Sequence, residues 1–121
     1  MLEEVWNLRR LDILPELCQR DACLHLPKGR VEGRDTMRDT FIVPVLEAFP
    51  DIVHEIDELI VQGNRVAMRF HGSGTHRGAF AEKAATSKRL DYAGITIFHM
   101  RDGKVSDIWN YSNWSEAFAA L

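Results

Sequence analysis

The sequence predicts an α+β fold in which helices come first and a run of antiparallel strands follows. Two observations carry this prediction. In the first part of the chain, apolar residues recur at three- and four-residue spacing, as they do along one face of a helix. Beyond Pro50 the spacing changes to two, and glycine-containing turns separate the alternating segments, as they do between the strands of an antiparallel sheet.

The composition fits one domain spanning residues 1–121. The chain is 45% hydrophobic, which is enough for one core, but it is too short for two ordinary domains. No apolar stretch approaches the roughly 20 residues that cross a bilayer, and the N-terminal residues lack the pattern of a secretory signal. We therefore expect a soluble, cytoplasmic protein without a membrane partner. The net charge of −3, without clusters of Lys and Arg, argues against nucleic acid.

The N-terminal region predicts two short helices. Helical periodicity runs from Glu3 to Arg20 and is broken near Pro15. Asp12 is expected to cap the second helix, which places Pro15 in the first turn, where a missing amide proton costs little.

A short strand and a third helix are expected next. The strand covers residues 22–26. The helix begins after a capping residue within 33–36, bends at Pro44 and stops at Pro50. Together with the first two helices, it gives about three N-terminal helices for the sheet to pack against.

In the rest of the chain, the residues alternate with a period of two, as side chains do between the two faces of a strand. The expected elements are a strand over residues 52–61, a hairpin turn at 62–64, a strand over 65–71, a loop from 72 to about 87, and two final strands over 89–100 and 105–111.

The turn at Arg101–Lys104 decides which side chains of the last two strands share a face. A two-residue type I′ turn would pair Arg101 with Lys104 and place His99 with Ser106. A three-residue turn with Gly103 in a bulge would instead pair Met100 with Lys104. The sequence of the turn is compatible with both types. We predict the bulged turn, which places on one face Asp91, His99, Asp107, Trp109, Tyr111 and Asn113.

Several short motifs in this order resemble the SnoaL-like polyketide cyclase family of the nuclear transport factor 2-like superfamily. They are Phe49-Pro50-Asp51, Gly63-Asn64-Arg65-Val66, Gly74-Thr75-His76-Arg77-Gly78, Ile95-Thr96-Ile97-Phe98 and Asp102-Gly103-Lys104-Val105 followed by Trp109, together with Val5-Trp6-Asn7 and Gly33-Arg34. The resemblance implies a cone-shaped curved sheet wrapped on three helices, an apolar pocket, and a homodimer packed through the outer sheet face.

The resemblance also implies a chemistry. In characterised cyclases of this family, a carboxylate on the last strand takes a proton beside a carbonyl group, a histidine on the preceding strand assists, and neither metal nor cofactor takes part. These positions correspond to Asn113 and His99 in this sequence. Because an amide cannot take a proton at neutral pH, the cyclase mechanism does not transfer intact.

We therefore expect Asp107 or Asp91 to replace the missing carboxylate, with a pKa raised by burial beside an aromatic wall. The predicted catalytic residues are His99, Asp107 and Asn113, and the predicted ligand-binding residues are Tyr111, Trp109, Asp91, Trp6, Phe41 and Arg69. No metal site is expected, because Cys18 and Cys23 have no second cysteine pair beside them and because His54, His71 and His76 lack the spacing of metal ligands.

Three functions compete on this basis. The leading one is cofactor-free acid–base chemistry, as in a cyclase or isomerase, on a small apolar molecule that carries a carbonyl group. The second is a non-catalytic ligand-binding or dimerisation module, favoured by the loss of the family's aspartate. The third is an epoxide-hydrolase-like enzyme in which Asp107, Asn113 and Arg69 hold a water molecule.

Overall fold

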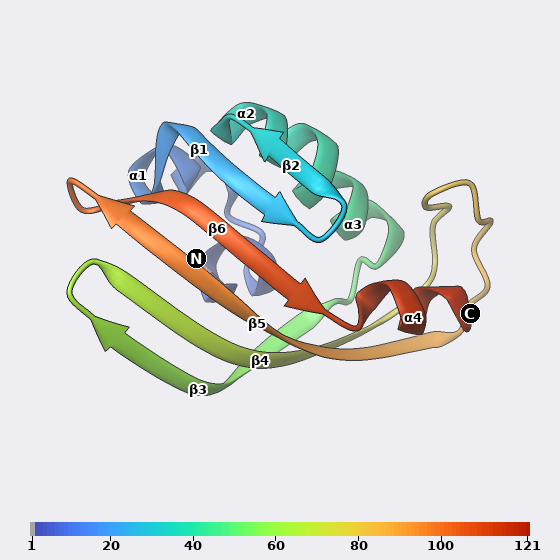
Figure 1. Cartoon of the computed structure of the whole chain (residues 1–121). Helices are drawn as coiled ribbons and strands as arrows, with labels where there is room; N and C mark the ends of the chain where they lie inside the picture. Colours follow the sequence, from blue (N-terminus) through green and yellow to red (C-terminus); the bar gives the residue numbers. More distant parts are fainter. Residues whose placement is uncertain (1) are drawn as a thin grey trace.

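The structure, a computed structural model that describes residues 2–121, is an α+β fold built on one six-stranded mixed sheet. Helical segments from the first half of the chain pack on one face of the curved sheet, and a short C-terminal helix lies at one end (Figure 1). The strands follow the order β2-β1-β6-β5-β4-β3. Neighbouring strands are antiparallel except for β1 and β6, which are parallel.

The helical segments are shorter and more numerous than predicted. They are η1 (Leu2–Asn7), η2 (Leu11–Ile13), α1 (Leu14–Leu17), α2 (Arg34–Met37), η3 (Arg38–Ile42), α3 (Val43–Ala48) and α4 (Trp114–Ala119). The strands are β1 (Cys18–Leu26), β2 (Gly29–Glu32), β3 (Val53–Gln62), β4 (Arg65–Thr75), β5 (Arg89–Arg101) and β6 (Lys104–Ser112).

Several predicted boundaries were wrong. The prediction of two helices from Glu3 to Arg20 fails at its end, because β1 already begins at Cys18. Pro15 does lie in the first turn of α1, but that helix has Ile13 at its N-cap and no side-chain cap, so Asp12 does not cap it. The chain also pairs as β4 as far as Thr75, where a loop was expected from residue 72.

The third helical region agrees better with the prediction. It runs without interruption through α2, η3 and α3, and Pro44 lies in the first turn of α3. No side chain caps its start, because Gly33 occupies the N-cap position of α2. The elements β2 and α4 were not predicted.

The hairpin between β5 and β6 combines features of both predicted alternatives. The turn is the two-residue type, with positive φ at Asp102 and Gly103, and Arg101 pairs with Lys104, so the predicted three-residue turn is wrong. A bulge one step further on shifts the register, so that Met100 pairs with Val105 but His99 pairs with Asp107. The predicted sharing of one face by His99 and Asp107 is thus confirmed, although by a different route.

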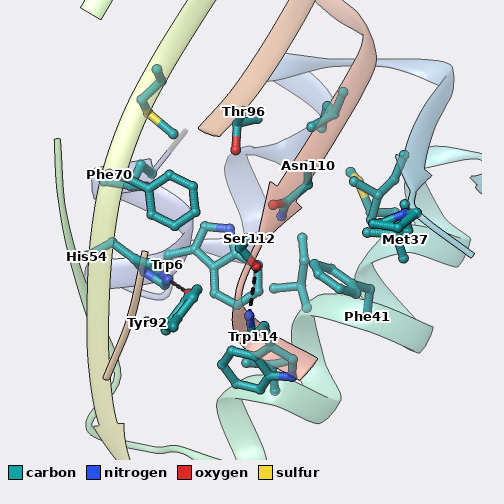
Figure 2. A pocket seen from close by; sticks show the side chains of 18 of the residues that line it. Trp6, Met37, Phe41, His54, Phe70, Tyr92, Thr96, Asn110, Ser112 and Trp114 are labelled. Carbon is teal, nitrogen blue, oxygen red and sulfur yellow. Dashed lines mark hydrogen bonds between the residues drawn. The ribbon is translucent and has the colours of Figure 1, made fainter. Parts of the chain in front are cut away.

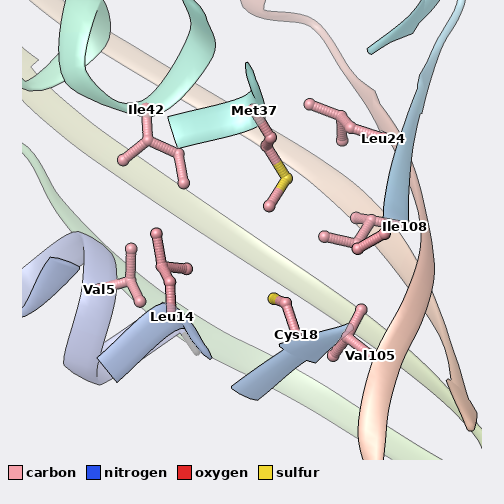
Figure 3. Packing of buried hydrophobic residues seen from close by; sticks show 9 residues of the cluster. Val5, Leu14, Cys18, Leu24, Met37, Ile42, Val105 and Ile108 are labelled. Atoms are coloured by element: carbon pink, nitrogen blue, oxygen red, sulfur yellow. The ribbon is translucent and has the colours of Figure 1, made fainter. Parts of the chain in front are cut away.

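The sheet buries one face against the helices. One apolar cluster joins η1, α1, α2 and η3 to β1 and β6 (Figure 3), and its members are Val5, Leu14, Cys18, Ala22, Leu24, Met37, Ile42, Val105 and Ile108. A second cluster lies at the other end of the helical layer, around the fully buried ring of Phe49. We call the face toward the helices inner and the opposite face outer.

Candidate functional site

A cavity of about 300 Å³ lies between the inner face of the sheet and the helices, and most of its wall is apolar. Within residues 2–121, the polar side chains on that wall are Lys28, His54, Tyr92, Thr96, Asn110, Ser112 and Ser115. No carboxylate of this part of the chain lines the cavity. An apolar cavity with a few convergent polar groups is the usual form of a small-molecule site.

The best-defined polar feature of the cavity is a hydrogen bond between Nε2 of His54 and the hydroxyl of Tyr92 (Figure 2). The two residues stand in register on β3 and β5, with Gly72 of β4 directly between them. A Cβ atom at Gly72 would lie 2.6 Å from Cδ2 of His54 and 2.8 Å from Cε1 of Tyr92. The glycine therefore leaves the space in which the two side chains meet over the middle strand.

His54 is held from several sides. Its backbone N–H donates to Oδ1 of Asn7 at 2.8 Å, and its backbone carbonyl accepts from Nδ2 of Asn7 at 2.9 Å. Its ring makes edge contacts with Trp6 and Phe70, at centroid distances of 5.5 and 5.8 Å. These contacts fix the ring in place at the cavity wall, as a binding or catalytic group requires.

Burial controls the protonation of this pair. It lowers the pKa of His54 from 6.5 to about 4, with a smaller contribution from the charge of His71. Burial also raises the pKa of the Tyr92 phenol. At neutral pH the cavity thus holds a neutral imidazole and a neutral phenol.

A second polar position lies on the same wall. Thr96 and Asn110 are register partners on β5 and β6, and both face the cavity (Figure 2). The Oδ1 atom of Asn110 and the Nδ1 atom of His54 are buried and lack hydrogen-bond partners within the described chain. Unsatisfied polar atoms are rare in protein interiors, and at a cavity wall a bound ligand or water can satisfy them.

The predicted site residues divide into two groups. Trp6 and Phe41 line the cavity, and that they bind a ligand stays a prediction. Seven others are absent from its wall, namely Arg69, Asp91, His99, Asp107, Trp109, Tyr111 and Asn113. Whether they bind a ligand or take part in chemistry elsewhere stays a prediction.

Six of the seven residues miss the cavity because of strand alternation, and Asn113 misses it because it lies beyond the last strand. On β5 and β6 the side chains of Thr96, Phe98, Ile108 and Asn110 face inward, so His99 and Asp107 face outward. Asn113 lies beyond β6 at the N-cap of α4, where its Oδ1 accepts a hydrogen bond from the backbone N–H of Ala93 at 2.9 Å.

The predicted replacements for the missing carboxylate also have other partners. Asp107 lies 3.1 Å from Nε2 of His25, and this hydrogen bond is the main reason that the pKa of Asp107 is lowered, contrary to the predicted rise. Asp91 pairs with Arg89 in solvent, and Arg69 pairs with Asp57 and Glu58 on the outer face. The three groups required for an epoxide-hydrolase-like site are thus not brought together at the cavity.

His54, Tyr92, Gly72 and Asn110 were missed as site residues. One signal was available, because the alternation of Ile52, His54 and Ile56 places the histidine with apolar residues rather than with the charged ones. The loop before β5 also contributes to the site, since Phe80 lines the cavity and Lys83 donates a hydrogen bond to the carbonyl of Phe118 in α4 at 2.9 Å.

Solved structures of similar fold agree with this architecture. A proposed SnoaL-like polyketide cyclase from Jannaschia sp. CCS1 has a TM-score of 0.90 at 20% identity, with 99% of this chain and 85% of that chain covered. IdmH, a proposed polyketide cyclase from Streptomyces antibioticus, has a TM-score of 0.81 at 23% identity, with 98% and 93% covered. AclR, a proposed hydroxylase from Streptomyces galilaeus, has a TM-score of 0.81 at 25% identity, with 93% and 70% covered.

Other comparisons complete the assignment. No curated protein matches the chain. No helix within residues 2–121 is long and apolar enough to span a membrane. The sequence model of the SnoaL-like polyketide cyclases matches residues 1–121. The chain therefore belongs to the SnoaL-like polyketide cyclase family.

Proposed function

We propose that the cavity binds a small, largely apolar carbonyl compound of polyketide type and stabilises its enolate. The observation that carries this proposal is the buried His54–Tyr92 pair on an otherwise apolar wall. Family membership supports the ligand class, because relatives of this fold are described as polyketide cyclases.

The pair can act as a chain of hydrogen-bond donors. The neutral imidazole donates from Nε2–H to the phenol oxygen, and the phenol O–H then donates to the carbonyl oxygen of the ligand. Such a donor gains strength as negative charge develops on that oxygen, because the surroundings are apolar. When a C–H bond beside the carbonyl breaks, the proton passes to water and the electron pair moves onto the oxygen that Tyr92 stabilises.

Thr96 and Asn110 provide a place for a second polar group of the ligand. They lie on the same wall as Tyr92, and Oδ1 of Asn110 has no partner in the described chain. The enol form of a 1,3-dicarbonyl compound, the repeating unit of a polyketide chain, offers one carbonyl oxygen that can accept from the Tyr92 hydroxyl and one O–H that can donate to Oδ1 of Asn110. This arrangement favours dicarbonyl over monocarbonyl ligands.

Benzoylacetone, an aryl 1,3-diketone, tests the proposal. Binding is measured by calorimetry, and enolisation is measured by deuterium exchange at C2 in NMR spectra. We expect Tyr92→Phe to weaken binding and to reduce the protein-dependent exchange rate by about 10²-fold, the effect typical of losing one donor to an oxyanion. Tyr111→Phe is the matched control, because Tyr111 lies off the cavity wall and is 55% exposed. Equal effects of the two substitutions would refute the proposal.

The absence of a carboxylate from the described cavity wall favours a second candidate, a ligand-binding module without catalysis. The same experiment separates the two functions. A binding module would take up benzoylacetone, and its affinity would depend on Tyr92, but the rate of deuterium exchange in the bound ligand would equal the rate in buffer.

We also propose that two copies associate through the outer sheet face, as the family resemblance implies. Ile60, Ala67, Ile97 and Trp109 form a cross-strand row on β3, β4, β5 and β6. The side chains of Ile60 and Ile97 are 57% and 40% exposed. A row of apolar residues on an otherwise charged face is typical of a protein–protein contact.

A further inference from the structure

The outer face of the sheet carries a second cluster of reactive side chains, away from the cavity. Cys23 and His25 of β1 lie beside Asp107 of β6, and one ligand atom from each lies within 4.8 Å of the other two. We propose that these three residues form a binding site for Zn²⁺ or a metal ion of similar preference. Because none of them lines the cavity, this proposal stands independently of the ligand and the chemistry proposed for the cavity.

The residue types suit zinc. Thiolate sulfur, imidazole nitrogen and carboxylate oxygen are its usual protein ligands, and sites with three protein ligands keep a fourth position for water. With a thiolate and a carboxylate as ligands, the charge of the divalent ion is balanced. All three residues are half-buried, so that the site is reachable from solvent but partly shielded from it.

The geometry is close to that of a bound ion. In a tetrahedral zinc site, bond lengths of about 2.0–2.3 Å place the ligand atoms roughly 3.2–3.8 Å apart. Nε2 of His25 and Oδ1 of Asp107 are already 3.1 Å apart. Sγ of Cys23 lies within 4.8 Å of one ring nitrogen of His25 and of one carboxylate oxygen of Asp107.

Neighbouring groups orient two of the ligands. The His25 ring stacks on Trp109 at a centroid distance of 4.4 Å and an interplanar angle of 7°. The hydroxyl of Ser106 lies 3.1 Å from Oδ2 of Asp107, which leaves Oδ1 for the ion. Support of this kind is characteristic of protein metal sites, and its loss typically weakens binding by about 10- to 100-fold.

This site could not be predicted from the sequence, because Asp107 is far along the chain from Cys23 and His25. His25 and Asp107 are separated by 82 residues, and only the parallel pairing of β1 with β6 brings them together. That pairing is irregular just before the cluster, where β1 advances from Cys18 to Cys23 while β6 advances only from Val105 to Asp107. A bound ion would join the two strands where their regular pairing resumes.

Titration of the reduced, metal-free chain with Co²⁺ tests the proposal. We expect visible absorption typical of a four-coordinate site and a thiolate-to-cobalt charge-transfer band, both removed by adding Zn²⁺. Cys23→Ser should abolish the charge-transfer band, and His25→Gln and Asp107→Asn should each weaken Co²⁺ binding by at least about tenfold.

Two substitutions serve as controls. Cys18→Ala removes the other cysteine of the chain, and His71→Gln removes a histidine that lies beside the carboxylates of Asp57 and Glu55 on the same face. Both variants should keep the band and the affinity.

The melting temperature provides an independent readout. Zn²⁺ should raise it in the unmodified chain and in His71→Gln but not in Cys23→Ser, because an ion bound only by the folded state stabilises that state. The proposal is overturned if the unmodified chain shows no charge-transfer band, if the band survives in Cys23→Ser, or if the controls lose affinity as much as the site variants do.

Discussion

Gly72 lies directly opposite His54 in the β3–β4 register, and a Cβ atom at this glycine would be 2.6 Å from Cδ2 of the histidine. On its other side the same glycine faces Tyr92. A single hydrogen atom in place of a side chain thus allows two buried polar groups to meet over the middle strand.

Gly72→Ala should therefore separate His54 from Tyr92. We expect a loss of about 1–3 kcal/mol in the free energy of unfolding, the usual cost of overpacking, and weaker binding of benzoylacetone. Urea denaturation and calorimetry measure the two effects. Gly74→Ala is a graded control on the same strand, because its closest contact would be 3.2 Å and the loss should be smaller. A fully stable Gly72→Ala variant with unchanged affinity would contradict the role given to this glycine.

The pKa of His54 predicts a dependence of stability on pH. Its value in the folded protein is about 4, below its ordinary value of 6.5, so the unfolded chain binds more protons between these limits. Stability from this residue is fully present above pH 6.5, is lost as the pH falls toward 4, and changes by up to about 1.4 kcal/mol per pH unit.

Urea denaturation of the unmodified chain and of His54→Gln between pH 7 and pH 4.5 measures this contribution. The difference in unfolding free energy between the two proteins should shrink as the pH falls. His71→Gln should show the opposite sign, because the hydrogen bond to Asp57 raises the pKa of His71 and its contribution is lost as the pH rises. A difference that stays constant with pH would show that burial does not control the protonation of His54.

Asn113→Asp tests whether the family's aspartate position can restore chemistry in this chain. Asn113 accepts a hydrogen bond from the N–H of Ala93 through Oδ1, and a carboxylate oxygen can accept the same bond. We expect a change in stability within about 0.5 kcal/mol and no faster deuterium exchange of benzoylacetone, because residue 113 does not line the cavity. A marked gain in exchange rate would show that this position reaches the ligand.

The proposed association through the outer face can be tested by placing a charge in its apolar row. Ile97→Glu places a carboxylate in the apolar row and should convert a homodimer into a monomer, as measured by analytical ultracentrifugation. Leu8→Glu is the control, because Leu8 is 57% exposed but lies outside the sheet. If the unmodified chain is already monomeric at the concentrations used, the proposed association through this face is wrong.

The sequence predicts elements with a long repeating pattern and misses the shorter ones. The alternation within β3, β4, β5 and β6 was clear because it extends along most of each strand, whereas in β1 only residues 22–26 were predicted to be extended. By contrast, β2 has only four residues and depends on pairing with β1, and its sequence Gly-Arg-Val-Glu has no distinct strand pattern. The π-type turns in η1 and η3 shift the helical spacing in a way that a regular period cannot anticipate.

The site was harder to predict because it depends on register. His54 and Tyr92 are separated by 38 residues, and they meet only because both pair with Gly72. For the last hairpin, the shared face of His99 and Asp107 was predicted, but alternation alone does not say whether that face points toward the helices or toward solvent. The positions of Thr96 and Asn110 on the cavity wall settle the question.

One inserted residue in β6 determines whether a charged or a neutral side chain of this strand faces the cavity. Ser106, whose hydroxyl lies 3.1 Å from the carbonyl oxygen of His99, occupies the bulge between Val105 and Asp107. If β6 ran straight from the turn, Asp107 would stand opposite Phe98 and project inward, whereas Asn110 would point to solvent. A shift of one residue in the register of β6 would therefore place the carboxylate of Asp107 on the inner face of the sheet and remove the neutral amide of Asn110 from it, with the strand order unchanged.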